Sequence, residues 1–279
     1  QREEPQEEPK KEATDPRKNL NYPPLAGPGP SGLRPEHIQE MFRARKRCVT
    51  GRLRRMWRRF LDLARAGLLP ESARWILGSD VMFLEKPGKP APRPIRKGET
   101  LAKDVAKSLI RDHKVKIERL MKSFGQYGVG IPGGAEALFH ARATIQDLAK
   151  ASSQKVIIIA DLDMVNWFGR IEWPAIRQAY AKHLPEMLPW TEWCTRTPLE
   201  AVLPCGRKAV INRGTGQGES DGPLKASVVG GEAVVQARQQ SIAATTSSFI
   251  FLAFPCAALH HISESDFGTA GVPIIVLLV

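Results

Sequence analysis

The stretch that most constrains the fold runs from residue 155 to residue 170 and reads KVIIIADLDMVNWFGR. Residues 156–160 form an unbroken run of β-branched and apolar side chains, which predicts a strand buried on both faces. Asp161 and Asp163 follow one strand period apart, so both carboxylates are expected on the same face. Such a pair is stabilised by a cation, most commonly a divalent metal ion, or it caps a turn in contact with water. The stretch alone leaves these two interpretations open.

Positive charge is concentrated in the first half of the chain. The 279 residues carry a net charge of +12, and residues 41–122 hold 23 Lys or Arg side chains against 8 acidic ones. A field this concentrated indicates a polyanionic partner, and nucleic acid is the first candidate. The alternative is a basic surface in contact with water that has no such partner.

Composition gives no support for a zinc site or a membrane span. The four cysteines lack the paired spacing of metal ligands, and we interpret them as reduced, intracellular thiols. The longest apolar runs, residues 249–259 and 272–279, are too short to span a bilayer. We therefore expect no membrane partner.

The chain divides into four segments. Residues 1–32 mix Glu, Lys, Pro and Gly, which predicts a disordered leader. Residues 33–150 are basic and mainly helical in pattern, and residues 151–240 contain the strand that ends in the two aspartates. Residues 241–279 are apolar and poor in charge, so we expect this tail to stand outside the domain.

Both helical and extended patterns occur along the chain. Helices are predicted over residues 36–66, 100–121, 135–149, 173–184 and 223–237. Residues 80–85 and the arm that begins at Arg93 are predicted as extended segments joined by a turn-rich tip. Residues 201–203 and 209–212 predict a hairpin.

The first predicted helix combines an apolar face with a row of arginines. Its apolar face is predicted to contain Leu53, Met56, Trp57, Phe60 and Ala64. The arginines assigned to nucleic-acid contacts are Arg52, Arg55, Arg58 and Arg59. Arginine forms bidentate contacts with phosphate, so this helix is predicted to lie along a nucleic-acid backbone. A basic amphipathic helix on an anionic membrane is the alternative that we weigh lower.

With these pieces in order, residues 32–237 resemble a reverse transcriptase domain of the kind found in non-LTR retrotransposons. Four blocks carry the resemblance: SGLRPEHI (residues 31–38), KPGKPAPRPIRKGETLAK (86–103), ADLDMVNWFGRIEWPAI (160–176) and NRGTGQGESDGP (212–223). The resemblance implies the fingers and palm of an RNA-directed DNA polymerase, without a thumb. It therefore implies an α+β fold with helices packed on a small antiparallel sheet. It also implies dNTP as substrate, an RNA template with a DNA primer or a hybrid duplex as partners, and a nuclear or ribonucleoprotein-associated location.

The resemblance assigns roles to individual residues of the third block. In the family, an aromatic residue stands five positions after the catalytic metal-binding aspartate, and Phe168 stands five positions after Asp163. Asp163 is therefore implied as the ligand of two Mg²⁺ ions, with the backbone carbonyl of Met164 completing one coordination sphere. Asp161 becomes a supporting acid. Phe168 would exclude a ribose 2′-hydroxyl, which implies dNTP rather than rNTP.

The second and fourth blocks supply the remaining implied contacts. By resemblance, Lys86 and Arg93 would hold the triphosphate. Gln217 and Gly218 would lie beneath the incoming nucleotide and the template base.

The chain departs from the family pattern in two places. The fourth block reads Gln-Gly-Glu-Ser-Asp-Gly from residue 217, where the family usually has Gln-Gly-Asp-Pro-Leu-Gly. The adjacent aspartate pair of the next family motif is missing, because the chain contains no Asp-Asp and the acids Glu264 and Asp266 follow no apolar strand. We therefore expect an incomplete two-metal site in a truncated or frame-shifted copy, whose activity is left open.

Three alternatives remain. The basic half could bind RNA or a hybrid duplex while the rest does no chemistry. The strand with Asp161 as nucleophile and Asp163 as general acid is also similar to that of haloacid-dehalogenase-type phosphatases, which would require a doubly wound parallel sheet. A decayed gene copy that does not fold stably would show no cooperative unfolding.

Overall fold

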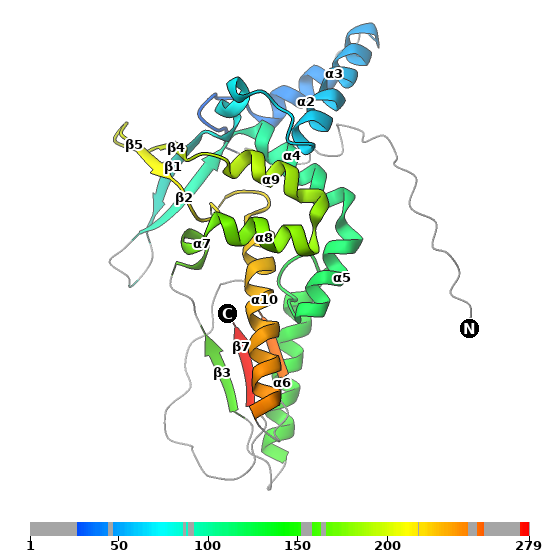
Figure 1. Cartoon of the computed structure of the whole chain (residues 1–279), viewed down its shortest axis with the longest axis vertical. Helices are drawn as coiled ribbons and strands as arrows, with labels where there is room; N and C mark the ends of the chain where they lie inside the picture. Colours follow the sequence, from blue (N-terminus) through cyan, green and yellow to red (C-terminus); the bar gives the residue numbers. More distant parts are fainter. Residues whose placement is uncertain are drawn as a thin grey trace, which may run out of the picture.

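The computed structural model describes residues 27–43, 47–85, 88, 92–151, 158–162, 166–216, 218–244, 250–253 and 274–278. Helices form most of this part of the chain (Figure 1). They are α2 (Pro35–Arg43), α3 (Arg47–Arg65), α4 (Thr100–Asp112), α5 (Lys114–Phe124), α6 (Gly134–Ala151), α7 (Trp167–Arg170), α8 (Trp173–His183), α9 (Leu188–Thr195) and α10 (Gly222–Ala244). Two short 3₁₀ segments, Glu71–Leu77 and Pro185–Met187, precede β1 and α9.

Two hairpins form a four-stranded sheet with the order β2-β1-β4-β5. Its strands are β1 (Ser79–Leu84), β2 (Arg93–Gly98), β4 (Leu199–Val202) and β5 (Lys208–Ile211). Both hairpins are antiparallel, as predicted. The hairpins meet through β1 and β4, which run parallel, so the expectation of a purely antiparallel sheet is wrong. Several helices connect β1 to β4, and a connection of that length allows parallel pairing.

The strand that ends in the aspartates lies in a second sheet. Strand β3 (Ile158–Leu162) pairs with β7 (Ile274–Leu278), and β7 pairs with β6 (Ile250–Ala253). Both pairs are parallel, so the antiparallel surroundings expected for residues 156–160 are not observed. Among the described strands β3 is an edge strand of this sheet. The other two strands of this sheet, β6 and β7, come from the tail (residues 241–279). The apolar runs of the tail are of the kind that pair in parallel.

Most predicted helices are confirmed, with two corrections. The pattern over residues 36–66 corresponds to two helices, α2 and α3, and residues 44–46 between them lie outside the described part. The pattern over residues 100–121 is divided at His113, whose backbone leaves the helical region (φ −111°, ψ 18°). Helix α5 then ends at Gly125 in a left-handed conformation (φ 71°), which is typical of a helix C-terminus.

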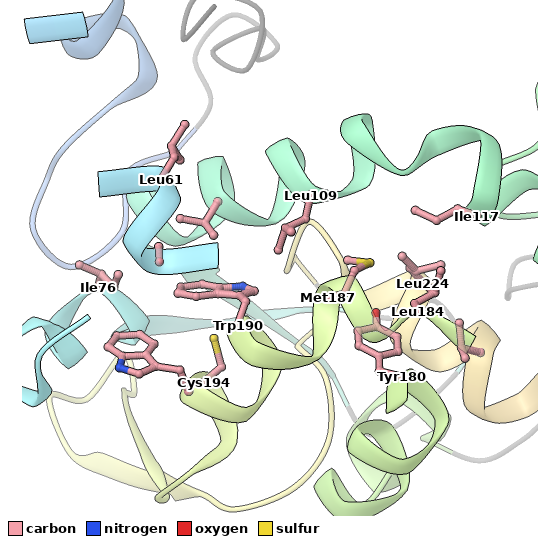
Figure 2. Packing of buried hydrophobic residues seen from close by; sticks show 14 of the residues in the cluster. Leu61, Ile76, Leu109, Ile117, Tyr180, Leu184, Met187, Trp190, Cys194 and Leu224 are labelled. Carbon is pink, nitrogen blue, oxygen red and sulfur yellow. The ribbon is translucent and has the colours of Figure 1, made fainter. Parts of the chain in front are cut away.

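One apolar cluster joins the helices of the two halves of the chain (Figure 2). Leu109 of α4 and Ile117 of α5 pack in the same cluster as Tyr180 of α8 and Leu224 of α10. Burial of side chains of this size stabilises the folded state by about 1.5–3 kcal/mol each. The cluster therefore holds the helices that carry the basic residues and those that follow the third block in one body.

Helix α3 has the amphipathic character that the sequence predicts, with one exception. Trp57, Leu61 and Ala64 are buried, and Trp57 packs edge-on against Phe42 at 5.8 Å between ring centroids. Met56, which we assigned to the apolar face, is 60% exposed. It precedes Trp57 by about 100° of helix rotation, and the core contacts only a narrow stripe of α3.

Within the part of the chain that the structure describes, no helix is both long and apolar enough to cross a membrane.

Candidate functional site

The first two sequence blocks meet at a buried glutamate. The backbone N–H of Ser31 donates to Glu99 Oε1 (2.7 Å), and its hydroxyl donates to Oε2 (2.6 Å). The Thr100 hydroxyl donates to the carbonyl of Leu33 (2.6 Å). These bonds tie the segment before α2 to the end of β2, so the two blocks form one local unit.

The third and fourth blocks are joined by backbone hydrogen bonds. The N–H of Thr215 donates to the carbonyl of Phe168, and the N–H of Gly214 donates to the carbonyl of Ile171, each at 2.7 Å. The indole N–H of Trp173 donates to the carbonyl of Gly214 (2.9 Å). The segment after β5 is therefore fixed against α7 and the start of α8.

The second and fourth blocks meet at Arg96 on β2. A Cβ atom added to Gly216 would collide with the guanidinium of Arg96, and one added to Gly218 would collide with the Arg96 carbonyl. Gly218 also has a φ of 114°, which glycine adopts readily and other residues rarely do. Both glycines thus allow the fourth block to lie directly against β2.

Together with β1 and β5, the second, third and fourth blocks enclose a cleft of about 280 Å³. Its walls are Val81, Phe83, Pro94, Arg96, Asn166, Phe168, Gly169, Leu203, Ile211, Arg213, Gly214, Thr215 and Gly216. The walls are mainly apolar and glycine-rich, with two guanidinium groups as the cationic members. This volume is close to the lower end of the range for small-molecule sites, and the combination of apolar walls with a few charges is typical of them.

The two cleft arginines have different surroundings. Arg213 is exposed and lies 3.6 Å from a carboxylate oxygen of Glu172. Arg96 is largely buried, and its Nη2 contacts Glu219. Burial lowers the pKa of Arg96 to about 10, and the negative charge of Asp221 opposes this change. The guanidinium therefore stays protonated at neutral pH.

A buried group of charges lies behind Arg96. The Nζ of Lys225 lies 2.9 Å from Asp221 and 3.5 Å from Glu219. Burial lowers the pKa of Lys225, but the attraction of Asp221, together with weaker contributions from Cys194 and Tyr180, raises it overall. Glu219 is thus shared between Arg96 and Lys225, and it holds the Arg96 side chain from the side of α10.

The structure brings some of the predicted site residues together and separates one. Phe168 lines the cleft, and Gly218 lies beside β2. Arg93 is on β2 but does not line the cleft, because side chains alternate along a strand and Arg96, three positions later, points to the opposite face. Lys86, Asp163, Met164 and Gln217 lie outside the described residues.

The described carboxylates near the cleft do not supply a metal site. No group of three His, Cys, Asp or Glu side chains among the described residues could hold a metal ion. Glu219 contacts Arg96 and Asp221 contacts Lys225, so each of these acids already lies against a cation of the chain itself. Asp163, the predicted Mg²⁺ ligand, lies outside the described residues.

Sequence reasoning missed Arg96 and Arg213. Both stand inside the quoted blocks, and the alternation of side chains along the predicted extended arm could have separated Arg96 from Arg93. The close approach of Gly216 and Gly218 to β2 has no such signal, because it depends on pairing between distant segments.

The basic face of α3 forms a separate surface. Arg52, Arg55, Arg58 and Arg59 are all exposed, while Trp57 of the same helix is buried. Guanidinium groups this close together along one helix present a dense positive field to the solvent. The exposure of these four arginines agrees with the basic face that the sequence predicts for this helix.

Neither the protein-family models nor the curated proteins that were compared with the chain gave a match.

Proposed function

We propose that the chain is the fingers and palm part of an RNA-directed DNA polymerase of the retrotransposon type, with a cleft for a deoxynucleoside triphosphate. The observation that supports this most strongly is the meeting of the second, third and fourth blocks around one cleft. The blocks were identified by resemblance alone, and residues this distant in sequence have no local reason to share a cavity.

The cleft has the chemical character that a nucleotide requires. Val81, Phe83 and Ile211 offer apolar surface to a sugar or a base, and Arg96 and Arg213 offer charge to phosphate oxygens. Guanidinium groups bind phosphate through short, charge-assisted hydrogen bonds. Phe168 lines the same cleft, where its ring would limit the space beside the sugar.

The nucleic-acid partner in this proposal is an RNA template paired with a DNA primer. The exposed arginines of α3 would contact the phosphate backbone of this hybrid, which fixes position but not sequence. Template-directed addition of dNTPs is the activity that the resemblance implies for complete relatives. Because the 279 residues contain no adjacent aspartate pair, the proposal for this chain is binding of nucleotide and hybrid with little or no primer extension.

Primer extension and binding together test this proposal. We expect the full chain, supplied with dNTPs, Mg²⁺, an RNA template and a DNA primer, to bind the hybrid and the dNTP and to extend the primer no faster than a protein-free control. Extension that Asp163→Ala abolishes would show a complete polymerase and overturn the expectation of an incomplete site. Absence of dNTP binding would contradict the nucleotide cleft.

A second candidate, a nucleic-acid-binding protein with no nucleotide site, is favoured by the four exposed arginines of α3. It predicts hybrid binding with a steep dependence on salt, because released counterions drive such binding. It also predicts no affinity for dNTPs. Measurement of both affinities on the same preparation separates the two candidates.

A further inference from the structure

We propose that Arg96, restrained by Glu219, is the side chain that binds the phosphate groups of the nucleotide in the cleft. This inference rests on the proposed function, since it concerns the same cleft. It differs from the sequence-based expectation, which gave this role to Lys86 and Arg93. It also assigns Glu219 the role of a competitor for the phosphate.

The position of Arg96 supports this role. The face of β2 toward the cleft carries Pro94 and Arg96, which pair with Phe83 and Val81 of β1, and all four side chains line the cleft. Arg93 pairs with Leu84, and neither of these two side chains lines the cleft. Arg96 is therefore the only β2 guanidinium that the described structure directs into the cleft.

The environment of Arg96 gives it more weight than an exposed arginine would have. Its side chain is 13% exposed, and Gly216 leaves space for the guanidinium against the backbone of the fourth block. Little water surrounds a charge at this depth, so its attraction to an incoming anion is weakly screened. The group is also held in place before the ligand arrives, which lowers the entropy cost of binding.

Glu219 makes this site adjustable. Its carboxylate contacts Nη2 of Arg96, and its other oxygen lies 3.5 Å from Lys225. A guanidinium carries five N–H donors, so it can serve a carboxylate and a phosphate together, but the negative charge of Glu219 opposes the second anion. Removal of that charge should therefore strengthen phosphate binding while Lys225 remains paired with Asp221.

The test measures the affinity of the full chain for dTTP, for inorganic triphosphate and for thymidine by titration calorimetry. We expect Arg96→Gln to weaken dTTP and triphosphate binding by about 10- to 100-fold, the range for a charge-assisted hydrogen bond, and to leave thymidine binding unchanged. Arg93→Gln is the matched control, because it removes the same charge from the opposite face of the same strand. It should change each affinity by less than about 2-fold.

Glu219→Gln keeps Arg96 and keeps the proposal testable if Arg96→Gln does not fold, as judged by circular dichroism. It should tighten dTTP binding by about 5-fold, the value of a partly exposed ion pair. Tightening supports the proposal. Unchanged or weaker binding in Glu219→Gln, or equal losses in Arg96→Gln and Arg93→Gln, would overturn it.

The proposed function and the role of Arg96 are contradicted by different results. A wild-type chain that binds neither dTTP nor triphosphate contradicts the proposed function itself. A wild-type chain that binds dTTP, with an Arg96→Gln variant that binds it equally well, contradicts only the role of Arg96. Titration with a hybrid oligonucleotide shows whether Arg96 binds backbone phosphates instead. If Arg96→Gln weakens hybrid binding and leaves dTTP binding unchanged, the proposal is wrong.

Discussion

Replacement of the buried Asp104 by asparagine should change how the stability of the protein depends on pH. Asp104 lies on α4 directly beneath the basic helix α3, and its side chain is fully buried. The indole N–H of Trp57 donates to Oδ2 at 2.9 Å, while Oδ1 has no hydrogen-bond partner in the described structure. Burial raises the pKa of this carboxyl from 3.8 to about 6, and the Trp57 hydrogen bond, Arg111 and Lys107 only partly oppose the rise.

The sign and size of the effect follow from proton linkage. Between about pH 4 and pH 6 the folded state binds a proton that the unfolded state has released, so this carboxyl stabilises the fold at low pH and loses that contribution as pH rises through about 6. A shift of about 2 pKa units corresponds to roughly 3 kcal/mol. The asparagine side chain of the variant stays neutral and can still accept the Trp57 hydrogen bond, so the variant lacks this dependence.

Urea denaturation followed by tryptophan fluorescence at pH 4, 5, 6 and 7 measures the difference. The unfolding free energy of Asp104→Asn minus that of the wild type should rise by about 2.5 kcal/mol from pH 4 to pH 7, because at pH 4 the unfolded state has already released much of its proton. Asp62→Asn, the same change at an exposed position of α3, should alter stability by less than about 0.5 kcal/mol throughout. A difference for Asp104→Asn that is constant with pH would refute the burial that raises the pKa of this carboxyl. Absence of any cooperative transition in the wild type would favour the decayed copy.

Three further variants test other parts of the structure. Trp173→Phe removes the hydrogen bond to the Gly214 carbonyl and should lower the unfolding free energy by about 1–2 kcal/mol in urea denaturation. An unchanged value would mean that this hydrogen bond does not join the third and fourth blocks. Gly216→Ala forces the Arg96 guanidinium to move and should lower the unfolding free energy by about 1–3 kcal/mol in the same assay. Gly98→Ala is the control, because a Cβ at that position meets open space. Equal losses in both variants would contradict the close approach of Gly216 to Arg96. Replacement of Arg52, Arg55, Arg58 and Arg59 by glutamine should make the slope of log affinity for a hybrid duplex against log salt shallower by about 3 to 4, while glutamine at Arg207 and Lys208 should leave it unchanged.

The sequence predicted local elements better than their partners. Periodicity located α8 and α10, and turn residues located both hairpins, because these signals depend on neighbouring residues. It did not predict that β1 and β4 run parallel, nor that the tail pairs with β3. Those pairings join segments that are distant in sequence, and no local pattern specifies which strand a free edge will meet.

The candidate site was predictable in its segments but not in its side chains. Phe168 and Gly218 came from the third and fourth blocks, and both lie where those blocks meet β2. Arg93 was chosen over Arg96 by resemblance, although strand alternation places them on opposite faces. Glu219, which contacts Arg96, comes from a loop whose approach to β2 is visible only in three dimensions.

The most direct test of the nucleotide cleft compares the binding of dUTP and UTP, which differ only in the ribose 2′-hydroxyl. If the sugar lies against Phe168 in the cleft, the wild-type chain should bind dUTP about 10- to 100-fold more tightly than UTP, which is the range for steric exclusion of one small group. The Phe168→Ala variant should bind both nucleotides almost equally. Equal affinities in the wild type, or a preference that survives Phe168→Ala, would contradict the assignment of this cleft as a deoxynucleotide site.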